Sequence, residues 1–172
     1  MRALVKFAPG PGNVAVQEVP PPQLTPGKVL IDVHAVAICG TDRSAIAGGH
    51  GMTVPRTLGH EVAGTISAIA PDVTAHLEVG DRVTVETDAY RCGNCEYCLK
   101  GEYDRCPYRL GIGTTVDGGL ADQLVMPAET VHKLVDDVHR ATVLNYESLV
   151  LEGDAESFLA TPDGGPEDAM VE

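Results

Sequence analysis

The amino-acid sequence predicts a mainly β fold, of the barrel or sandwich kind, with a short helical segment near its C-terminal end. Short apolar or alternating segments dominate the first 135 residues. Proline and glycine pairs separate these segments at spacings typical of an all-β protein. After Val138 the apolar residues cluster in a way that favours helices over strands.

Seven segments have the length and composition of strands. They are Arg2–Phe7, Val14–Val19, Val29–Ala37, Val62–Ile69, Arg82–Glu86, Leu120–Val125 and Val131–Leu134. Turn-forming runs stand between them, among them Pro9-Gly10-Pro11-Gly12, Pro20-Pro21-Pro22, Pro26-Gly27, Gly48-Gly49 and Gly118-Gly119. Within this part of the chain, only Thr41–Ala47 is predicted as a short helix.

The chain after Val138 is predicted to form one or two helices and then a tail. Its apolar residues are Val143, Leu144, Leu149, Val150, Leu151, Phe158 and Leu159. The last twelve residues hold two prolines, two glycines and four acidic residues, which favours disorder. We therefore divide the chain into one domain (1–138), a helical extension (139–160) and a disordered tail (161–172).

Composition restricts the class of partner. With 172 residues, of which 44% are hydrophobic and 22% charged, the chain is long and apolar enough to fold around one core. A net charge of −13 argues against binding of nucleic acid through its phosphates. No run of about 18 apolar residues and no signal-peptide pattern is found, so we expect no membrane partner and a cytoplasmic location.

Four of the five cysteines lie in one short stretch, at positions 92, 95, 98 and 106. Cys92, Cys95, Cys98 and Cys106 follow one another at the short steps that let a single loop wrap a zinc ion. Two disulfides are the alternative, but the cytoplasmic composition favours the metal. With four thiolate ligands the predicted site is closed, so it would hold a lobe of about residues 91–107 and leave no position for a substrate.

The fifth cysteine, Cys39, ends an apolar strand-like run and precedes Gly40-Thr41-Asp42. Further on, His60 lies in Gly59-His60-Glu61, where a loop meets the next predicted strand. A single cysteine after a strand is more often a small buried residue than a reactive one. On these residues alone, a structural and a functional interpretation both stay open.

Residues 1 to about 138 resemble the catalytic domain of the zinc-dependent medium-chain alcohol and polyol dehydrogenases. The motifs that carry the resemblance are Cys39-Gly40-Thr41-Asp42, Gly59-His60-Glu61-Val62-Ala63-Gly64 with Ala70 and Val73, Gly80-Asp81-Arg82-Val83, the four-cysteine stretch, and Asp117-Gly118-Gly119-Leu120-Ala121-Asp122. They occur in the order that the family has. The resemblance implies a GroES-like, partly open β-barrel with a zinc-binding lobe.

The resemblance also implies a second, catalytic zinc ion. Cys39 and His60 would bind it, with Glu61 beside it as an outer neighbour or an occasional ligand. Glu147 is the candidate third ligand, because Lys133-Leu134-Val135-Asp136-Asp137-Val138 leads to Glu147-Ser148-Leu149 at the distance where polyol-type relatives have Glu-Pro-Leu. Such a site keeps one coordination position open for the alcohol oxygen of a substrate.

Two hydroxyl residues match the proton relay of this family. Thr41 corresponds to the residue that takes the proton of the alcohol, which requires hydrogen-bond reach to the reacting oxygen. Ser44 stands where many relatives have a histidine that completes the relay. The sequence therefore predicts the first step of the relay and leaves the second step open.

The function implied is NAD(P)-dependent oxidation of an alcohol, a polyol or a sugar, with two zinc ions per chain. Gly111-Ile112-Gly113 lacks the third glycine of a dinucleotide-binding turn. We therefore expect the chain to be inactive alone and to use NAD or NADP only where a nucleotide-binding domain is supplied, for example by a separate chain. The alternative is a non-enzymatic zinc-stabilised GroES-like module or a truncated gene product, and a homo-oligomer is compatible with both.

Overall fold

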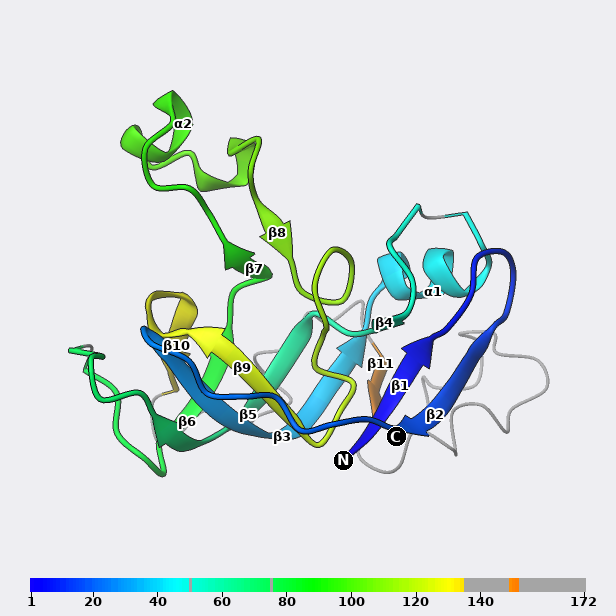
Figure 1. Ribbon diagram of the computed structural model, residues 1–172, viewed down its shortest axis with the longest axis horizontal. Helices are drawn as coiled ribbons and strands as arrows, with labels where there is room; N and C mark the ends of the chain where they lie inside the picture. Colours follow the sequence, from blue (N-terminus) through cyan, green and yellow to red (C-terminus); the bar gives the residue numbers. More distant parts are fainter. Residues whose placement is uncertain (50, 75, 135–148, 152–172) are drawn as a thin grey trace, which may run out of the picture.

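A curled, antiparallel β-sheet forms the body of the chain in the computed structural model (Figure 1). The structure describes residues 1–49, 51–74, 76–134 and 149–151. Neighbouring strands of the large sheet are, in order, β10 (Val131–Lys133), β6 (Arg82–Val85), β5 (Glu61–Ile69), β3 (Lys28–Ile38) and β11 (Leu149–Leu151). Strand β9 (Gln123–Pro127) also pairs with β3.

Strand β3 is the longest element and organises the sheet. One edge of it pairs with β5. The other edge pairs with β9 along residues 28–32 and with β11 along residues 36–38. Its register against β5 shifts twice, between Leu30 and Ile31 and between Val33 and Ala35. Irregularities of this kind bend a strand and increase its twist, which accounts for the curl of the sheet.

A smaller sheet closes part of the barrel. Strand β1 (Arg2–Lys6) lies between β2 (Val14–Glu18) and β4 (Arg56–Thr57). The Leu4 N–H donates to the Leu120 carbonyl at 2.8 Å, and the Asp122 N–H donates to the Arg2 carbonyl at 3.1 Å. The segment that leads into β9 thereby joins the two sheets, and the predicted partly open barrel is confirmed.

The core fills the inside of this curl. Alternate residues of β3 face it, since Val29 and Ile31 are completely buried while Leu30 and Asp32 are half-buried. The main cluster consists of Val29, Ile31, Val36, Val62, Ile66, Val83, Ile112, Leu124, Met126, Ala128 and Val131. Ile112 belongs to the return path from the cysteine lobe, so the lobe is tied to the same core.

Most predicted elements are present, with shifted ends. Strand β9 begins at Gln123, three residues later than the predicted Leu120, because residues 118–122 hydrogen-bond to β1 and to residues 57–59. The predicted helix is α1 (Gly40–Ile46). Six short elements were not predicted from the sequence: β4, β7 (Asp88–Tyr90), α2 (Glu96–Leu99), β8 (Leu110–Gly111) and the 3-10 helices Tyr103–Arg105 and Ala128–Thr130.

The predicted helical extension (139–160) and tail (161–172) lie almost entirely outside the described residues. Their only described part, Leu149–Leu151, forms strand β11 against β3, so a strand replaces the predicted helix at these three positions. Pairing with the exposed edge of β3 explains the change, because backbone partners there outweigh a weak local preference. In the described part of the chain, no helix has the length and apolarity needed to cross a membrane.

The Asp81 side chain ties together the turn before β6 and the end of β10. Its carboxylate accepts a hydrogen bond from the Glu78 N–H at 2.8 Å and pairs with the Lys133 ammonium group. The Lys133 hydrogen bond holds the pKa of Asp81 below its ordinary value of 3.8. The stabilisation is therefore present above pH 3.8 and is lost as the pH falls through the lowered pKa.

We predict that Asp81→Asn lowers the free energy of unfolding at pH 7 by about 1 kcal/mol, as for a partly exposed ion pair. Urea denaturation from pH 7 down to acid conditions measures it, and the difference from the wild type should shrink with decreasing pH. Lys133→Met and the double variant complete a mutant cycle that isolates the pair. A stability difference between Asp81→Asn and the wild type that stays constant across this pH range would contradict the assignment of the stabilisation to the ionised Asp81 carboxylate.

Candidate metal sites

The four-cysteine stretch forms a lobe that projects from the barrel (Figure 1). Strands β7 and β8 pair with each other and carry the chain out and back. Between them lie α2 and a 3-10 turn, Tyr103–Arg105. Gly93 and Gly101 adopt positive φ angles of 71° and 78°, which L-residues with side chains rarely adopt, so glycine allows the loop to curl here.

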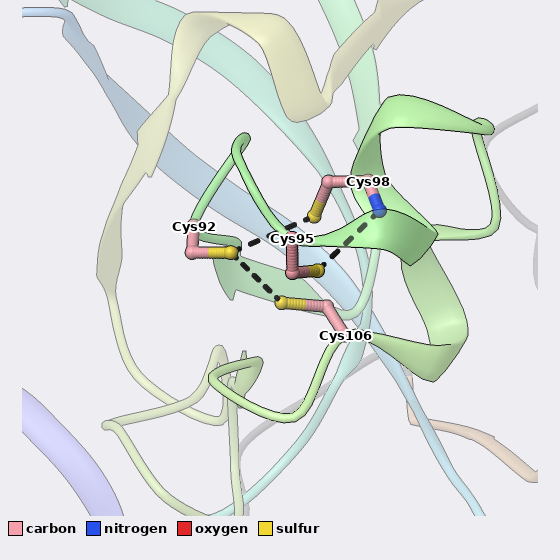
Figure 2. Close-up of side chains that lie close together, drawn as sticks. All are labelled: Cys92, Cys95, Cys98 and Cys106. Atoms are coloured by element: carbon pink, nitrogen blue, oxygen red, sulfur yellow. Dashed lines mark hydrogen bonds between the residues drawn. The ribbon is translucent and has the colours of Figure 1, made fainter.

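The four cysteine side chains converge on one point (Figure 2). The Sγ atom of Cys92 lies 3.9 Å from that of Cys98 and 3.7 Å from that of Cys106. Two thiolates bound to one tetrahedral zinc ion at 2.3 Å would be about 3.8 Å apart. All five cysteines are free thiols, which excludes the two-disulfide alternative in this structure. The residues present therefore fit a closed zinc site.

The thiols of this cluster differ in acidity. The Asn94 N–H is the largest of several hydrogen-bond donors that lower the pKa of Cys92 to about 7, whereas burial is the largest of the effects that raise the pKa of Cys98 to about 12. The Cys98 N–H also donates to the Cys95 sulfur at 3.4 Å. Donors arranged in this way stabilise negative sulfur, which is the form that binds zinc.

Arg91 fixes the lobe to the barrel beside the first cysteine. Its guanidinium group lies 3.2 Å from the Glu86 carboxylate and 3.6 Å from that of Glu129, measured between nitrogen and oxygen. The same group lies 4.0 Å from the centre of the Tyr103 ring, within the lobe. One largely buried cation thus links the residue after β6, the turn before β10 and the outer part of the lobe.

A second group of metal-binding side chains lies at the ends of two neighbouring strands. Cys39 follows the last residue of β3 and caps α1, while His60 and Glu61 stand where β5 begins. One ligand atom of each of these three residues lies within 4.8 Å of the others. All three residues are half-buried, whereas two of the four cysteines of the lobe, Cys98 and Cys106, are buried. The second group is therefore more open to solvent.

The buried Asp42 carboxylate joins the two segments that carry Cys39 and His60. Its Oδ2 atom accepts a hydrogen bond from the Cys39 N–H at 3.1 Å, and its Oδ1 atom accepts one from the Gly59 N–H at 3.0 Å. Oδ2 also lies 3.7 Å from Nδ1 of His60. Burial raises the pKa of Asp42, although His60 and the two N–H groups act in the opposite direction.

The role of Asp42 in joining these two segments was not predicted from the sequence. A signal for it exists, since an acidic residue at the third position of a helix can bond back to the residue that caps the helix. The second bond, to Gly59, spans seventeen residues of sequence. No local pattern predicts such a contact.

The other residues predicted for this second cluster are Thr41, Ser44 and Glu147. The Thr41 hydroxyl lies 3.9 Å from the Cys39 sulfur, beside the second cluster. Ser44 lies three residues further along α1, half-buried, and its hydroxyl makes no hydrogen bond with another described residue. Glu147 lies outside the described residues. The structure therefore brings together Cys39, Thr41, His60 and Glu61.

Comparisons with known proteins identify the family of this domain. Residues 25–136 match the family model of the alcohol dehydrogenase GroES-like domain. A sorbitol dehydrogenase from Halalkalibacterium halodurans is 44% identical over 142 residues, which cover 80% of this chain and 40% of that protein.

Two solved structures have the same fold. Galactitol-1-phosphate dehydrogenase from Escherichia coli superposes with a TM-score of 0.75 at 30% identity, over 83% of this chain and 40% of that one. A cobalt- and zinc-bound thermostable alcohol dehydrogenase from Pyrobaculum aerophilum gives a TM-score of 0.71 at 32% identity, over 80% of this chain and 42% of that one. The chain thus spans about 40% of the length of these relatives.

We predict that Asp42→Ala destabilises the fold by about 2–5 kcal/mol, because two backbone N–H groups each lose a charged acceptor. Urea denaturation of the metal-free protein measures the loss. Asp72→Ala is the matched control, since Asp72 accepts a hydrogen bond from the Gly27 N–H in an exposed position. Equal losses in the two variants would contradict a special role for Asp42.

Proposed function

The chain belongs to the family of alcohol dehydrogenase GroES-like domains, and from this membership we propose that it supplies the zinc-binding, alcohol-activating part of a polyol or sugar dehydrogenase. Its relatives are alcohol and polyol dehydrogenases, and it corresponds to their catalytic domain. Two zinc ions per chain are part of the proposal. The lobe would hold one, and Cys39 with His60 would hold the other.

A single observation carries the proposal. Cys39 follows β3, while His60 and Glu61 stand together at the start of β5, yet the ligand atoms of all three lie within 4.8 Å of one another, and the hydroxyl side chain of Thr41 adjoins them. Three side chains of this kind leave a coordination position for a further ligand, unlike the four cysteines of the lobe. The donor set of thiolate, imidazole and carboxylate suits zinc.

The chain's own residues would divide the work in the second cluster. Oδ2 of Asp42 lies 3.7 Å from Nδ1 of His60, which is buried and has no hydrogen-bond partner among the described residues. With a metal bound, the carboxylate would accept a hydrogen bond from this nitrogen and direct the other ring nitrogen toward the metal, as carboxylates do in zinc sites. The zinc ion, when bound, would supply a Lewis acid that lowers the pKa of an alcohol hydroxyl. The Thr41 hydroxyl would accept the proton of that alcohol while releasing its own, and Ser44, three residues further along α1, is the candidate next carrier toward solvent.

Glu61 and Glu147 are the candidates for a remaining protein ligand. Glu61 adjoins His60 and lies within reach of the Cys39 sulfur. Glu147 stays a prediction from the sequence. The proposal assigns Glu147 the permanent third position and Glu61 an occasional one.

The proposed substrates are polyols or sugars with a secondary hydroxyl group, and NAD or NADP would accept the hydride. Support comes from the relatives, which include a sorbitol dehydrogenase and a galactitol-1-phosphate dehydrogenase. The zinc assignment is supported by the cobalt- and zinc-bound relative. Cobalt therefore offers a spectroscopic substitute for zinc in the experiments below.

We predict that the purified chain binds two zinc ions and that Cys39→Ala binds one. The lobe would be unaffected by this change, because Cys39 lies in another part of the fold. Metal analysis after dialysis against excess zinc measures the stoichiometry. The complementary variant Cys95→Ala should also lose one ion while keeping the Cys39 site. One ion in the wild type, with Cys39→Ala leaving the content unchanged, would refute the catalytic-zinc assignment.

We also predict that sorbitol shifts the visible absorption of the Cys39 site in the cobalt-loaded chain. Thr41→Val should weaken the apparent affinity for sorbitol by about 10-fold, which corresponds to one lost hydrogen bond of about 1.4 kcal/mol. Thr25→Val, at an exposed position outside both clusters, serves as the control. An absence of any shift with polyols, sugars and simple alcohols would argue against the proposed substrate class.

A further inference from the structure

Three glycines form a close backbone contact beside His60. A Cβ atom on Gly118 would lie 2.1 Å from the Gly59 carbonyl oxygen and 2.5 Å from that of Leu58. A Cβ atom on Gly113 would lie 2.8 Å from the same Gly59 oxygen. Because these neighbours are backbone atoms, no side-chain movement could make room for an added methyl group.

The contact brings the return path of the cysteine lobe onto the segment that ends in His60. Gly118, Gly119 and Leu120 donate backbone hydrogen bonds to the carbonyls of residues 57, 59 and 58, at 2.9 Å each. The Asp117 carboxylate accepts a bond from the Thr57 N–H at 3.0 Å. The segment 117–120 therefore covers residues 57–59 along their whole length.

Gly59 is held from two sides. Its N–H donates to Asp42, and its carbonyl oxygen accepts from the Gly119 N–H and lies against Gly113 and Gly118. Its φ of +89° is a conformation that glycine adopts readily and other residues rarely do. The next residue is His60. The direction in which the chain leaves Gly59, and hence the position of the His60 side chain, depends on this double attachment.

We propose that the segment 113–120 is a positioning element for the metal ligand His60. It acts through backbone contacts that only glycine permits at positions 113 and 118, and it ties the placement of His60 to the path by which the lobe returns to the barrel. The inference rests on the proposed function, because it treats His60 as a metal ligand. The residues of the segment are positioning residues, since none of them belongs to either cluster.

The test is cobalt titration of Gly118→Ala in the full chain. The φ angle of Gly118 lies outside the left-handed region, so alanine there meets a steric conflict with the backbone of residues 58, 59 and 113 and no unfavourable φ. We expect cobalt binding at the Cys39 site to weaken about 10- to 100-fold, as when outer-shell support of a ligand is removed. The tetracysteine cobalt spectrum should be unchanged. Gly51→Ala is the matched control, because a Cβ there meets no atom within 4 Å and its φ is also outside the left-handed region.

A second, less disruptive variant tests the inference if Gly118→Ala does not fold. Asp117→Ala removes the side-chain anchor to Thr57 and to Arg56, while the Asp117 side chain is 69% exposed and outside the core. If Gly118→Ala fails to fold, a weakened Cys39 site with an intact lobe spectrum in Asp117→Ala supports the inference, and unchanged binding at both sites overturns it.

The outcomes separate this inference from the proposed function. A wild-type chain that binds a single cobalt ion, at the four cysteines, contradicts the proposed function and with it the inference. Two ions in the wild type and an unaltered Cys39-site affinity and spectrum in Gly118→Ala would leave the proposed function standing and overturn the inference alone.

Discussion

The buried Asp42 carboxylate is the interaction on which the candidate site depends. Through two backbone hydrogen bonds it connects the end of β3 with the start of β5, so that Cys39 and His60 stand at one place. The β3–β5 ladder ends at Glu61, so the segment before it is fixed by other contacts, namely this carboxylate and the backbone bonds of segment 117–120. The carboxylate thus holds the segments that carry Cys39 and His60 together before any metal is bound.

Much of the barrel could be predicted from the sequence because its strands are locally consistent. Alternating apolar residues and proline or glycine pairs mark β1, β2, β3, β5, β6 and β10 well, with ends displaced by a residue or two. The four clustered cysteines are equally visible, since their spacing is short and belongs to one loop. In these segments the information needed to place a residue lies within a few neighbours in the chain.

The features that the sequence analysis missed depend on distant partners. The two-residue strand β4 exists because β1 offers it an edge, and the start of β9 is delayed because residues 118–122 find other partners. Asp42 and Gly118 resemble ordinary helix and turn residues until the segments they contact are known. Leu149–Leu151 likewise form a strand where a helix is expected, next to an edge of β3. In each of these cases, a contact with a segment distant in the sequence determines the local structure.

The pairing of β7 with β8 determines how the cysteine lobe is attached to the barrel. Asp88 and Gly111 are partners in the ladder, so the whole cysteine lobe leaves the barrel and returns to it at one place. A segment with adjoining ends can be lengthened, shortened or replaced while the strands that carry it stay in register. We therefore expect the outer part of the lobe to tolerate insertions and deletions that the strands of the barrel would not.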